Sequence, residues 1–294
     1  MRSMMLLVNP NAGKGGYKTE LGGILKTFSD GDILPSVYFS RAPGEIPKLV
    51  EAHAAEYDMV SCLGGDGTLS EVCAGLMRAP ERRPIGYIPL GTANDVAHTL
   101  GLSPRPSDAA KDILIGAPAP YDIGQFGERD FFTYVAAFGA FTEVSYATPQ
   151  ENKQVLGHLA YMLEALRQLP KLTDHHAVVE YDGGTLEGDF IFGAVTNSTS
   201  VGGLVKLDNE MVGLADGAFE MLLVRKPQDI LDLGDIISSA LSLDFSGPFV
   251  SFIKSSQVRF RFDGPVAWTR DGEDGGTHSE VLIRNRHPGV EIIV

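Results

Sequence analysis

The 294-residue sequence has few cysteines and no long apolar run. Its two cysteines, Cys62 and Cys73, show neither a metal-ligand spacing nor a disulfide framework, so buried thiols are predicted. No stretch reaches the roughly 18 uncharged apolar residues that a membrane-spanning helix needs. The first apolar run, 4–8, ends at Asn9 and Pro10, which is too early for a signal peptide. These absences favour a cytoplasmic protein.

Basic residues are also scarce. The chain has 24 Lys and Arg against 38 Asp and Glu, which gives a formal net charge of −14. Such a charge repels the phosphates of nucleic acid, so no nucleic-acid partner is expected. Anionic lipid is repelled as well, over a Debye length of about 8 Å at physiological salt, so any membrane contact must rely on local apolar or basic features.

The chain does contain enough apolar residues for a core, with 44% hydrophobic and 21% charged residues. Its length favours two domains. In the first 120 residues, short apolar runs alternate with helical patterns, which predicts an open α/β domain with a parallel sheet. The strands expected there are 4–8, 33–39, 59–63 and 85–88, and the helices are 18–28, 46–56, 69–77 and 95–100.

After Tyr121 the pattern changes to longer runs that are rich in β-branched and aromatic residues, which predicts a β-rich second domain. Helical spacing interrupts these runs at 155–166 and 230–241. Core packing is the simplest interpretation of both helices, and membrane contact is the alternative. The strands expected in this half are 130–138, 176–181, 190–196, 218–224 and 258–262.

The strongest local signal is the segment Gly64-Gly65-Asp66-Gly67-Thr68, which lies between an expected strand and an expected helix. Glycines let the backbone approach an anion, and the unpaired N–H groups of a helix start attract phosphate. A carboxylate beside phosphates is repulsive unless a metal ion lies between them, so Asp66 implies Mg²⁺. The alternative is a tight turn in which Asp66 caps the helix.

Two further glycine loops follow expected strands. The segment 9–16 begins with Asn9-Pro10 and includes Gly13-Lys14, but it lacks the P-loop spacing and the Rossmann pattern. The segment 89–95 offers Thr92 and Asn94 to phosphate or ribose. Ligands bind at the carboxyl ends of strands in open α/β sheets, so three such loops together predict a nucleotide site.

In combination these three segments resemble the nucleotide motifs of the diacylglycerol kinase catalytic family, which includes bacterial lipid kinases and sphingosine kinase-like enzymes. The resemblance continues through 121–124, Asn197 with 202–203, 214–219 and 271–273, and so covers nearly the whole chain. Ser70 stands where the family often has Asn, and Val96 where Phe is frequent. Neither difference removes a group that the mechanism requires.

The resemblance implies an N-terminal α/β domain that binds ATP and a C-terminal β-sandwich-like domain that carries the lipid pocket. The expected boundaries are 1–123 with about 286–294 for the first, whose last strand returns from the second, and 124–285 for the second. The implied reaction transfers the γ-phosphoryl group of ATP to a lipid hydroxyl, with diacylglycerol as the first expectation. The substrate implies transient, peripheral contact with the membrane surface, and since family members are often dimers, a homodimer is also an expectation.

The resemblance also implies roles for individual residues. Glu273 is the expected general base, and Asp271, Asp66 and Lys14 complete the catalytic set. Phosphoryl transfer needs an aligned hydroxyl, neutralised phosphates and a proton acceptor, which these groups could supply. The implied metal ligands are Asp66, Asp95 and Asp122, and Asp216 with the carbonyls of Gly213 and Ala218 at a structural Mg²⁺. The implied nucleotide contacts are Asn9, Pro10, Asn11, Ala12, Gly13, Ser40, Gly64, Gly65, Gly67, Thr68, Glu71, Thr92, Asn94 and Asp95.

Simpler interpretations remain for several of these residues. Residues 270–276 are typical of a solvated acidic hairpin turn, and Asp216-Gly217 of a β-turn. Asp122 could be a strand-end turn residue and Lys14 a solvated cation. Two other functions also stay open: a kinase of a soluble substrate, similar to NAD kinase or 6-phosphofructokinase, and a non-catalytic nucleotide or lipid sensor. The sequence leaves diacylglycerol, undecaprenol, phosphatidylglycerol and sphingosine as candidate lipids.

Overall fold

The computed structural model describes residues 1–140, 173–198, 200–201, 205–206 and 212–294. The chain divides into two compact units. Unit 1 comprises Met1–Tyr134, Leu214–Gly217 and Asn285–Val294, and unit 2 comprises Val135–Gly213 and Ala218–Arg284. The helix expected at 155–166 and the Gly202-Gly203 pair lie outside the described residues.

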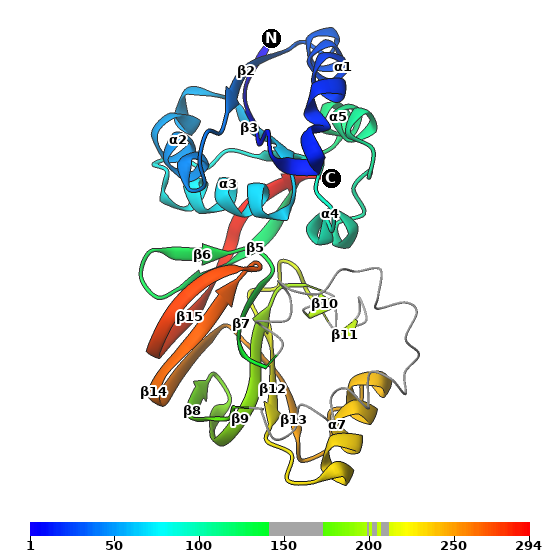
Figure 1. Ribbon diagram of the computed structural model, residues 1–294. Helices are drawn as coiled ribbons and strands as arrows, with labels where there is room; N and C mark the ends of the chain where they lie inside the picture. Colours follow the sequence, from blue (N-terminus) through cyan, green and yellow to red (C-terminus); the bar gives the residue numbers. More distant parts are fainter. Residues whose placement is uncertain (141–172, 199, 202–204, 207–211) are drawn as a thin grey trace. The chain divides into compact units, whose positions relative to one another are not determined.

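Unit 1 is built on a parallel sheet that is flanked by helices (Figure 1). Its strands lie in the order β4 (Ile85–Pro89), β3 (Met59–Gly64), β1 (Arg2–Val8) and β2 (Ile33–Phe39). Val8 pairs with both Phe39 and Leu63, and Gly64 pairs with Pro89. Because the registers agree, the loops that follow these strands emerge side by side. Ile292 of β15 (Glu273–Ile293) pairs with Ile85 and extends the sheet.

Helices cover both faces of this sheet. One core joins Met4 and Leu6 of β1 to α1 (Tyr17–Asp30) and α5 (Pro106–Ile115). The other joins Met5 and Leu7 to α2 (Glu45–His53) and α3 (Asp66–Arg78). Alternate residues of β1 thus point to opposite cores, which is why the strand is apolar along its whole buried length. The mixed α/β fold class is confirmed.

The rest of unit 1 consists of short elements. They are the 3-10 helices η1 (Ala12–Gly15) and η2 (Ala54–Glu56), the helix α4 (Asp95–Thr99), and the hairpin of β5 (Pro118–Phe126) and β6 (Asp130–Phe132). The single strand expected at 130–138 is wrong, because β6 pairs with β5 whereas β7 (Val135–Gly139) pairs with two strands of unit 2, β9 (Gly184–Thr196) and β14 (Gln257–Arg270). The helix α5 was not expected.

Unit 2 is strand-rich and antiparallel. Its strands follow the order β13 (Val250–Ser255), β12 (Phe219–Arg225), β9 (Gly184–Thr196), β7, β14 (Gln257–Arg270) and β15, and β8 (His175–Tyr181) pairs with β9 and β14. The strands β10 (Ser200–Val201) and β11 (Val205–Lys206) form a separate pair. The core is aromatic: the rings of Phe138 and Trp268 lie 4.9 Å apart, and those of Phe260 and Trp268 5.2 Å apart.

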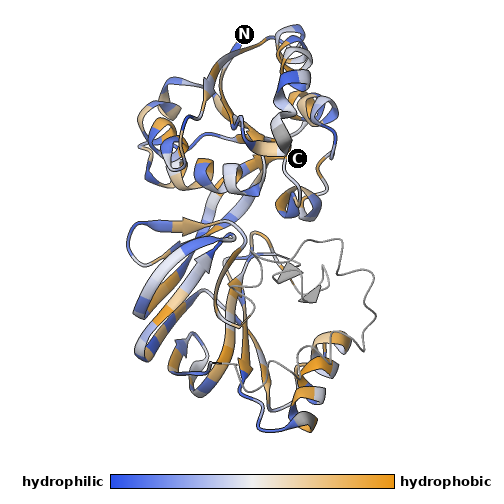
Figure 2. Ribbon diagram, viewed as in Figure 1, coloured by the Kyte–Doolittle hydropathy of each residue, from blue (hydrophilic) through white to orange (hydrophobic). Residues whose placement is uncertain are grey.

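One helix of unit 2, α7 (Ile230–Ser242), is rich in apolar residues (Figure 2). Leu233 is buried, whereas Leu231 and Leu241 are 74% and 59% exposed. Within the part of the chain that the structure describes, every helix falls short of the length and apolarity required to cross a membrane.

Candidate active site

Three loops meet at the carboxyl edge of the sheet in unit 1. The first follows β1, the second links β3 to α3, and the third links β4 to α4. The Asn9 amide nitrogen donates to Thr68 Oγ1 at 3.1 Å, which joins the first loop to the second. The Leu90 backbone N–H donates to the Gly64 carbonyl at 2.7 Å, which joins the second to the third. The three glycine loops therefore form one surface.

Glycine is required where these loops touch. A Cβ placed on Gly91 would lie 2.7 Å from the Gly65 Cα atom, so the two backbones are in direct contact. Gly13 has φ +54, and a Cβ there would lie 2.3 Å from the Leu90 carbonyl oxygen. Any larger residue would push the loops apart. These glycines thus hold the three loops close together.

The start of α3 lies at the centre of this surface. Gly65 is the N-cap residue, with φ −93 and ψ −172, and the helix runs for 13 residues from Asp66. The first backbone N–H groups of a helix have no partner within it, and the helix dipole adds partial positive charge there. The buried Thr68 hydroxyl lies beside them. This arrangement is suited to binding phosphate.

Asp66 holds the third loop instead of capping its own helix. Its carboxylate accepts hydrogen bonds from the backbone N–H groups of Asp95 at 2.9 Å and Val96 at 3.1 Å, which form the start of α4. The Tyr87 hydroxyl lies 3.5 Å away, and burial, together with the nearby Asp66 charge, raises the pKa of this phenol. The interpretation of Asp66 as the cap of α3 is therefore wrong, since Gly65 takes that position.

Other predicted contact residues also stabilise the loops. Asn94 is left-handed, with φ 53, and its side chain exchanges hydrogen bonds with the backbone of Gly91 at 2.9 and 3.1 Å. Glu71 accepts from the Gly44 N–H at 2.7 Å, before α2. Ser40 is buried, and Thr92 is exposed at the surface of the third loop.

The first loop is closed by its own asparagine. The Asn11 N–H donates to Asn9 Oδ1 at 3.0 Å, and the Ala12 N–H donates to the Asn9 carbonyl at 3.2 Å. Pro10 lies between these residues. Lys14 belongs to η1, and its side chain lies outside the described part of the structure.

Asp122 forms a buried cluster elsewhere in unit 1. Its fully buried carboxylate accepts from the Gly217 N–H at 2.8 Å, the Asn285 amide at 3.1 Å and His287 Nδ1 at 2.7 Å. The Asp122 N–H in turn donates to the Leu214 carbonyl at 2.9 Å. Asp122 therefore fixes the segment that carries Asp216. No sequence signal identified Asn285 and His287, because they lie more than 160 residues further along the chain.

The acidic hairpin lies in unit 2, between β14 and β15. Arg270 pairs with Glu273, and the two residues between them have φ 48 at Asp271 and φ 81 at Gly272. Two successive positive φ values are typical of a tight type I′ hairpin turn. Asp271 is 7% exposed and accepts from the Val135 N–H at 3.1 Å, so it is not solvated, whereas Glu273 is exposed.

Comparisons with known proteins agree with these motifs. The model of the diacylglycerol kinase catalytic domain matches residues 3–126. Diacylglycerol kinase of Bacillus subtilis strain 168 is 31% identical over 280 residues, covering 94% of this chain and 91% of the relative. That of Staphylococcus carnosus strain TM300 is 32% identical over 278 residues, covering 92% and 88%.

The chain belongs to the diacylglycerol kinase family. The fold agrees with this membership. A crystal structure of a protein assigned as a diacylglycerol kinase from Bacillus anthracis strain Sterne matches this chain with a TM-score of 0.81 and 25% sequence identity. The match covers 99% of this chain and 96% of the Bacillus anthracis chain. The resemblance that the motifs indicated is confirmed.

The acids at the candidate site are already engaged by protein donors. Among the described residues there is no group of three or more His, Cys, Asp or Glu side chains that could hold an ion. The carboxylates of Asp66 and Asp122 each already accept hydrogen bonds from at least three protein donors. Mg²⁺ is commonly held by one or two carboxylates together with substrate phosphates. The acids present fit an ion that arrives with the nucleotide.

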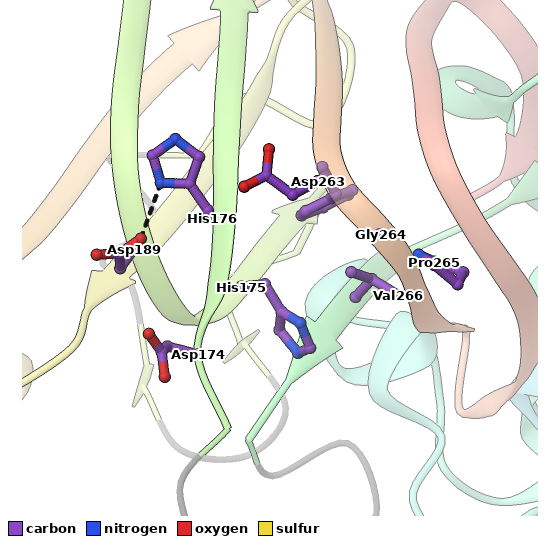
Figure 3. A pocket seen from close by; sticks show the side chains of 9 residues that line it. Asp174, His175, His176, Asp189, Asp263, Gly264, Pro265 and Val266 are labelled. Carbon is purple, nitrogen blue, oxygen red and sulfur yellow. Dashed lines mark hydrogen bonds and ion pairs between the residues drawn. The ribbon is translucent and has the colours of Figure 1, made fainter.

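One hollow of this diacylglycerol kinase homologue lies in unit 2 (Figure 3) and has a volume of about 320 Å³. Asp174, His175, His176, Asp189 and Asp263 line it, and His176 Nδ1 lies 2.8 Å from Asp189. Charged walls of this kind do not suit acyl chains, because an apolar chain cannot satisfy them. This hollow is therefore unsuited to the lipid tails.

Proposed function

We propose that this chain is an ATP-dependent lipid kinase that transfers the γ-phosphoryl group of ATP to the free hydroxyl of diacylglycerol and so forms phosphatidic acid. The observation that carries the proposal is the contact of three glycine loops around the start of α3, in a chain of the diacylglycerol kinase family. Such a surface offers backbone donors to a triphosphate.

The nucleotide contacts proposed for unit 1 follow from this geometry. Backbone N–H groups at Gly65 and Gly67 face the phosphates, and the Thr68 hydroxyl adds a donor beside them. Asn9, Asn94 and Asp66 act mainly by fixing the loops, since their side chains are engaged in the contacts described above. The ligand thus binds to preorganised backbone donors, which lowers the entropy cost of binding.

Mg²⁺ is part of the same proposal. When bound, it neutralises phosphate charge during transfer. Asp66 and Asp95 would hold it, directly or through water, at the start of α3 and α4. A second, structural ion would use the Asp216 side chain and the carbonyls of Gly213 and Ala218. Asp122 would keep this segment in place through its bond to the Gly217 N–H.

Glu273 is the proposed general base. Its carboxylate is exposed and makes no hydrogen bond or ion pair with the residues that the structure describes. It can therefore take the proton of the diacylglycerol hydroxyl while the oxygen of that hydroxyl bonds to the γ-phosphorus and the bond to ADP breaks. Asp271 positions the turn that carries Glu273, through its contact with Val135.

The membrane contact is proposed to be apolar. The net charge of −14 opposes electrostatic attraction to anionic lipid. The exposed leucines of α7, Leu231 and Leu241, offer an apolar surface instead. Vesicle flotation tests this: Leu231→Gln and Leu241→Gln should reduce binding to vesicles that contain diacylglycerol. The matched control is Leu34→Gln in unit 1, where the side chain is 60% exposed, and equal loss in all three variants would exclude α7.

The roles of the two units complete the proposal. Unit 1 would bind ATP, and unit 2 would receive the lipid through residues other than those of the charged hollow. A homodimer is the proposed assembly, and light scattering of the purified protein reads it directly, since a monomer mass would exclude it.

An acceptor panel tests the reaction itself. Labelled ATP and the purified chain are mixed with diacylglycerol, undecaprenol, phosphatidylglycerol or sphingosine in mixed micelles, and separately with NAD or fructose 6-phosphate. The proposal expects label mainly in diacylglycerol. Label in a soluble acceptor would support the NAD kinase or phosphofructokinase alternative, and ATP binding without transfer to any acceptor would support a sensor.

A further inference from the structure

A second hollow of unit 1 has an unusual charge for such an acidic chain. It has a volume of about 470 Å³ and lies between α2, the end of α3, the β5–β6 hairpin and β15. Four arginines line it, Arg78, Arg82, Arg129 and Arg286, with only two carboxylates, Glu51 and Glu128. This arginine pocket therefore carries an excess of two positive charges, whereas the whole chain has a net charge of −14.

Three of the four arginines are held in place by hydrogen bonds, and none of the four is neutralised by an ion pair with a described residue. Arg78 donates to the Arg129 carbonyl at 2.8 Å, Arg82 to the Pro288 carbonyl at 3.0 Å, and Arg286 to Gln125 Oε1 at 2.6 Å. Arg78 also lies over the Phe131 ring, 5.8 Å from its centroid. Among the described residues, none of the four guanidinium groups has a carboxylate oxygen within 4.0 Å.

These contacts leave donors available. A guanidinium group has five N–H donors, and the described bonds use one or two of them in Arg78, Arg82 and Arg286. The Arg129 side chain makes no described hydrogen bond, because only its backbone carbonyl is engaged. Preorganised forks of this kind match the oxygens of phosphate and can bind them in pairs.

The arginine pocket is separate from the nucleotide loops. Arg78 is the last residue of α3, and Asp66, at the loops, is the first. A helix rises about 1.5 Å per residue, so these two residues lie roughly 18 Å apart along the axis. A nucleotide bound at the start of α3 therefore leaves the pocket accessible to another ligand.

Size and charge define that ligand. A hollow of this volume lies in the range of small-molecule sites, about 300–1,000 Å³. A phosphate monoester carries a charge of about −1.5 to −2 at neutral pH, which matches the excess of two positive charges. We propose that the arginine pocket binds a phosphate monoester, either the headgroup of a phosphorylated lipid or a soluble phosphate compound, at a site distinct from that of ATP.

Calorimetry with glycerol 3-phosphate tests the soluble form, with a non-hydrolysable ATP analogue present to fill the nucleotide loops. Flotation with phosphatidylcholine vesicles, with or without phosphatidic acid, tests the lipid form. Arg129→Gln and Arg286→Gln should each weaken binding at least about tenfold, because each removes a charged hydrogen-bond donor. Both side chains are exposed, so both variants should fold, which thermal unfolding checks.

Arg284→Gln is the matched control. This substitution removes the same charge from an exposed arginine of β15 that does not line the pocket. The affinity of this variant for either probe should therefore stay within about twofold of that of the wild type. Selective loss of glycerol 3-phosphate binding identifies a soluble ligand, and selective loss of phosphatidic acid binding identifies a lipid. Equal binding by all four proteins, or binding of neither probe, overturns the proposal. Both assays measure binding and require no turnover. A negative result would therefore overturn this inference without bearing on the proposed kinase activity.

Discussion

Asp66 of unit 1 and Glu273 of unit 2 are both acids next to glycine, but their environments are opposite. Asp66 is 9% exposed, and its two oxygens accept from the backbone of α4. Glu273 is exposed at a hairpin, and its carboxylate makes no hydrogen bond or ion pair with the described residues. Buried carboxylates need their hydrogen bonds to offset desolvation, whereas an exposed one can exchange a proton. The comparison separates acids that hold the backbone in position from Glu273, the acid that is proposed to take part in the reaction.

Two further acids belong to the first kind. Asp122 is fully buried, and its carboxylate accepts hydrogen bonds from at least three donors. Asp271 is 7% exposed and accepts a hydrogen bond from the Val135 N–H. In a sequence motif all of these residues look the same, because the motif shows only that each position holds an acid. Only the contacts show which of them the fold already uses.

The largest expected effect is that of Glu273→Gln. Loss of a general base typically lowers turnover by about 10²–10⁴-fold. Because the side chain is exposed, the free energy of unfolding should change by less than about 0.5 kcal/mol. Label transfer and urea unfolding measure the two quantities. Asp274→Asn, an exposed acid in the next position, should leave turnover nearly unchanged, and a similar loss in both variants would remove the special role of Glu273.

Asp66→Asn should have the next largest effect, and on a different quantity. An amide keeps one acceptor oxygen and presents an N–H₂ group to the other backbone donor, so we expect a loss of about 1.5–3 kcal/mol of unfolding free energy. The control is Asp95→Asn, whose side chain accepts no described hydrogen bond, and it should cost less than about 0.5 kcal/mol. Equal stability of the two variants in urea would mean that Asp66 is not a positioning acid.

Gly91→Ala tests the contact between loops. The new Cβ would lie 2.7 Å from the Gly65 Cα atom, so the loops must separate. We expect a cost of about 1–3 kcal/mol in unfolding free energy, together with weaker ATP binding in calorimetry. Gly22→Ala is the control, because its Cβ would meet nothing within 4 Å on the exposed side of α1, and it should stabilise the helix slightly. Unchanged ATP affinity in Gly91→Ala would argue against the proposal that the three glycine loops form the ATP site.

The smallest effect is expected for His287→Ala. It removes one of the described donors to Asp122 from a partly exposed position, so about 0.5–1 kcal/mol of unfolding free energy should be lost. His98→Ala, an exposed histidine of α4, should cost less than this. If thermal unfolding shows no difference between the two, the Asp122 cluster does not depend on His287.

The sequence predicted local features well and distant partners poorly. The strand–glycine–helix order at Gly64–Thr68 and the Asp271-Gly272 turn could be predicted, because both depend on adjacent residues. The use of Asp66 to cap α4 could not, since its partners are 29 and 30 residues away. The break in the strand expected at 130–138 also depends on tertiary pairing, because β6 pairs with β5 whereas β7 pairs with β9.

The most direct test of the kinase assignment is the stoichiometry of transfer. Purified protein is given γ-labelled ATP, Mg²⁺ and diacylglycerol in mixed micelles, and ADP and labelled phosphatidic acid are measured together. The proposed reaction predicts that the two appear in equal amounts and that neither forms without the lipid. ADP formed without labelled lipid would contradict it, since the chain would then hydrolyse ATP rather than phosphorylate diacylglycerol.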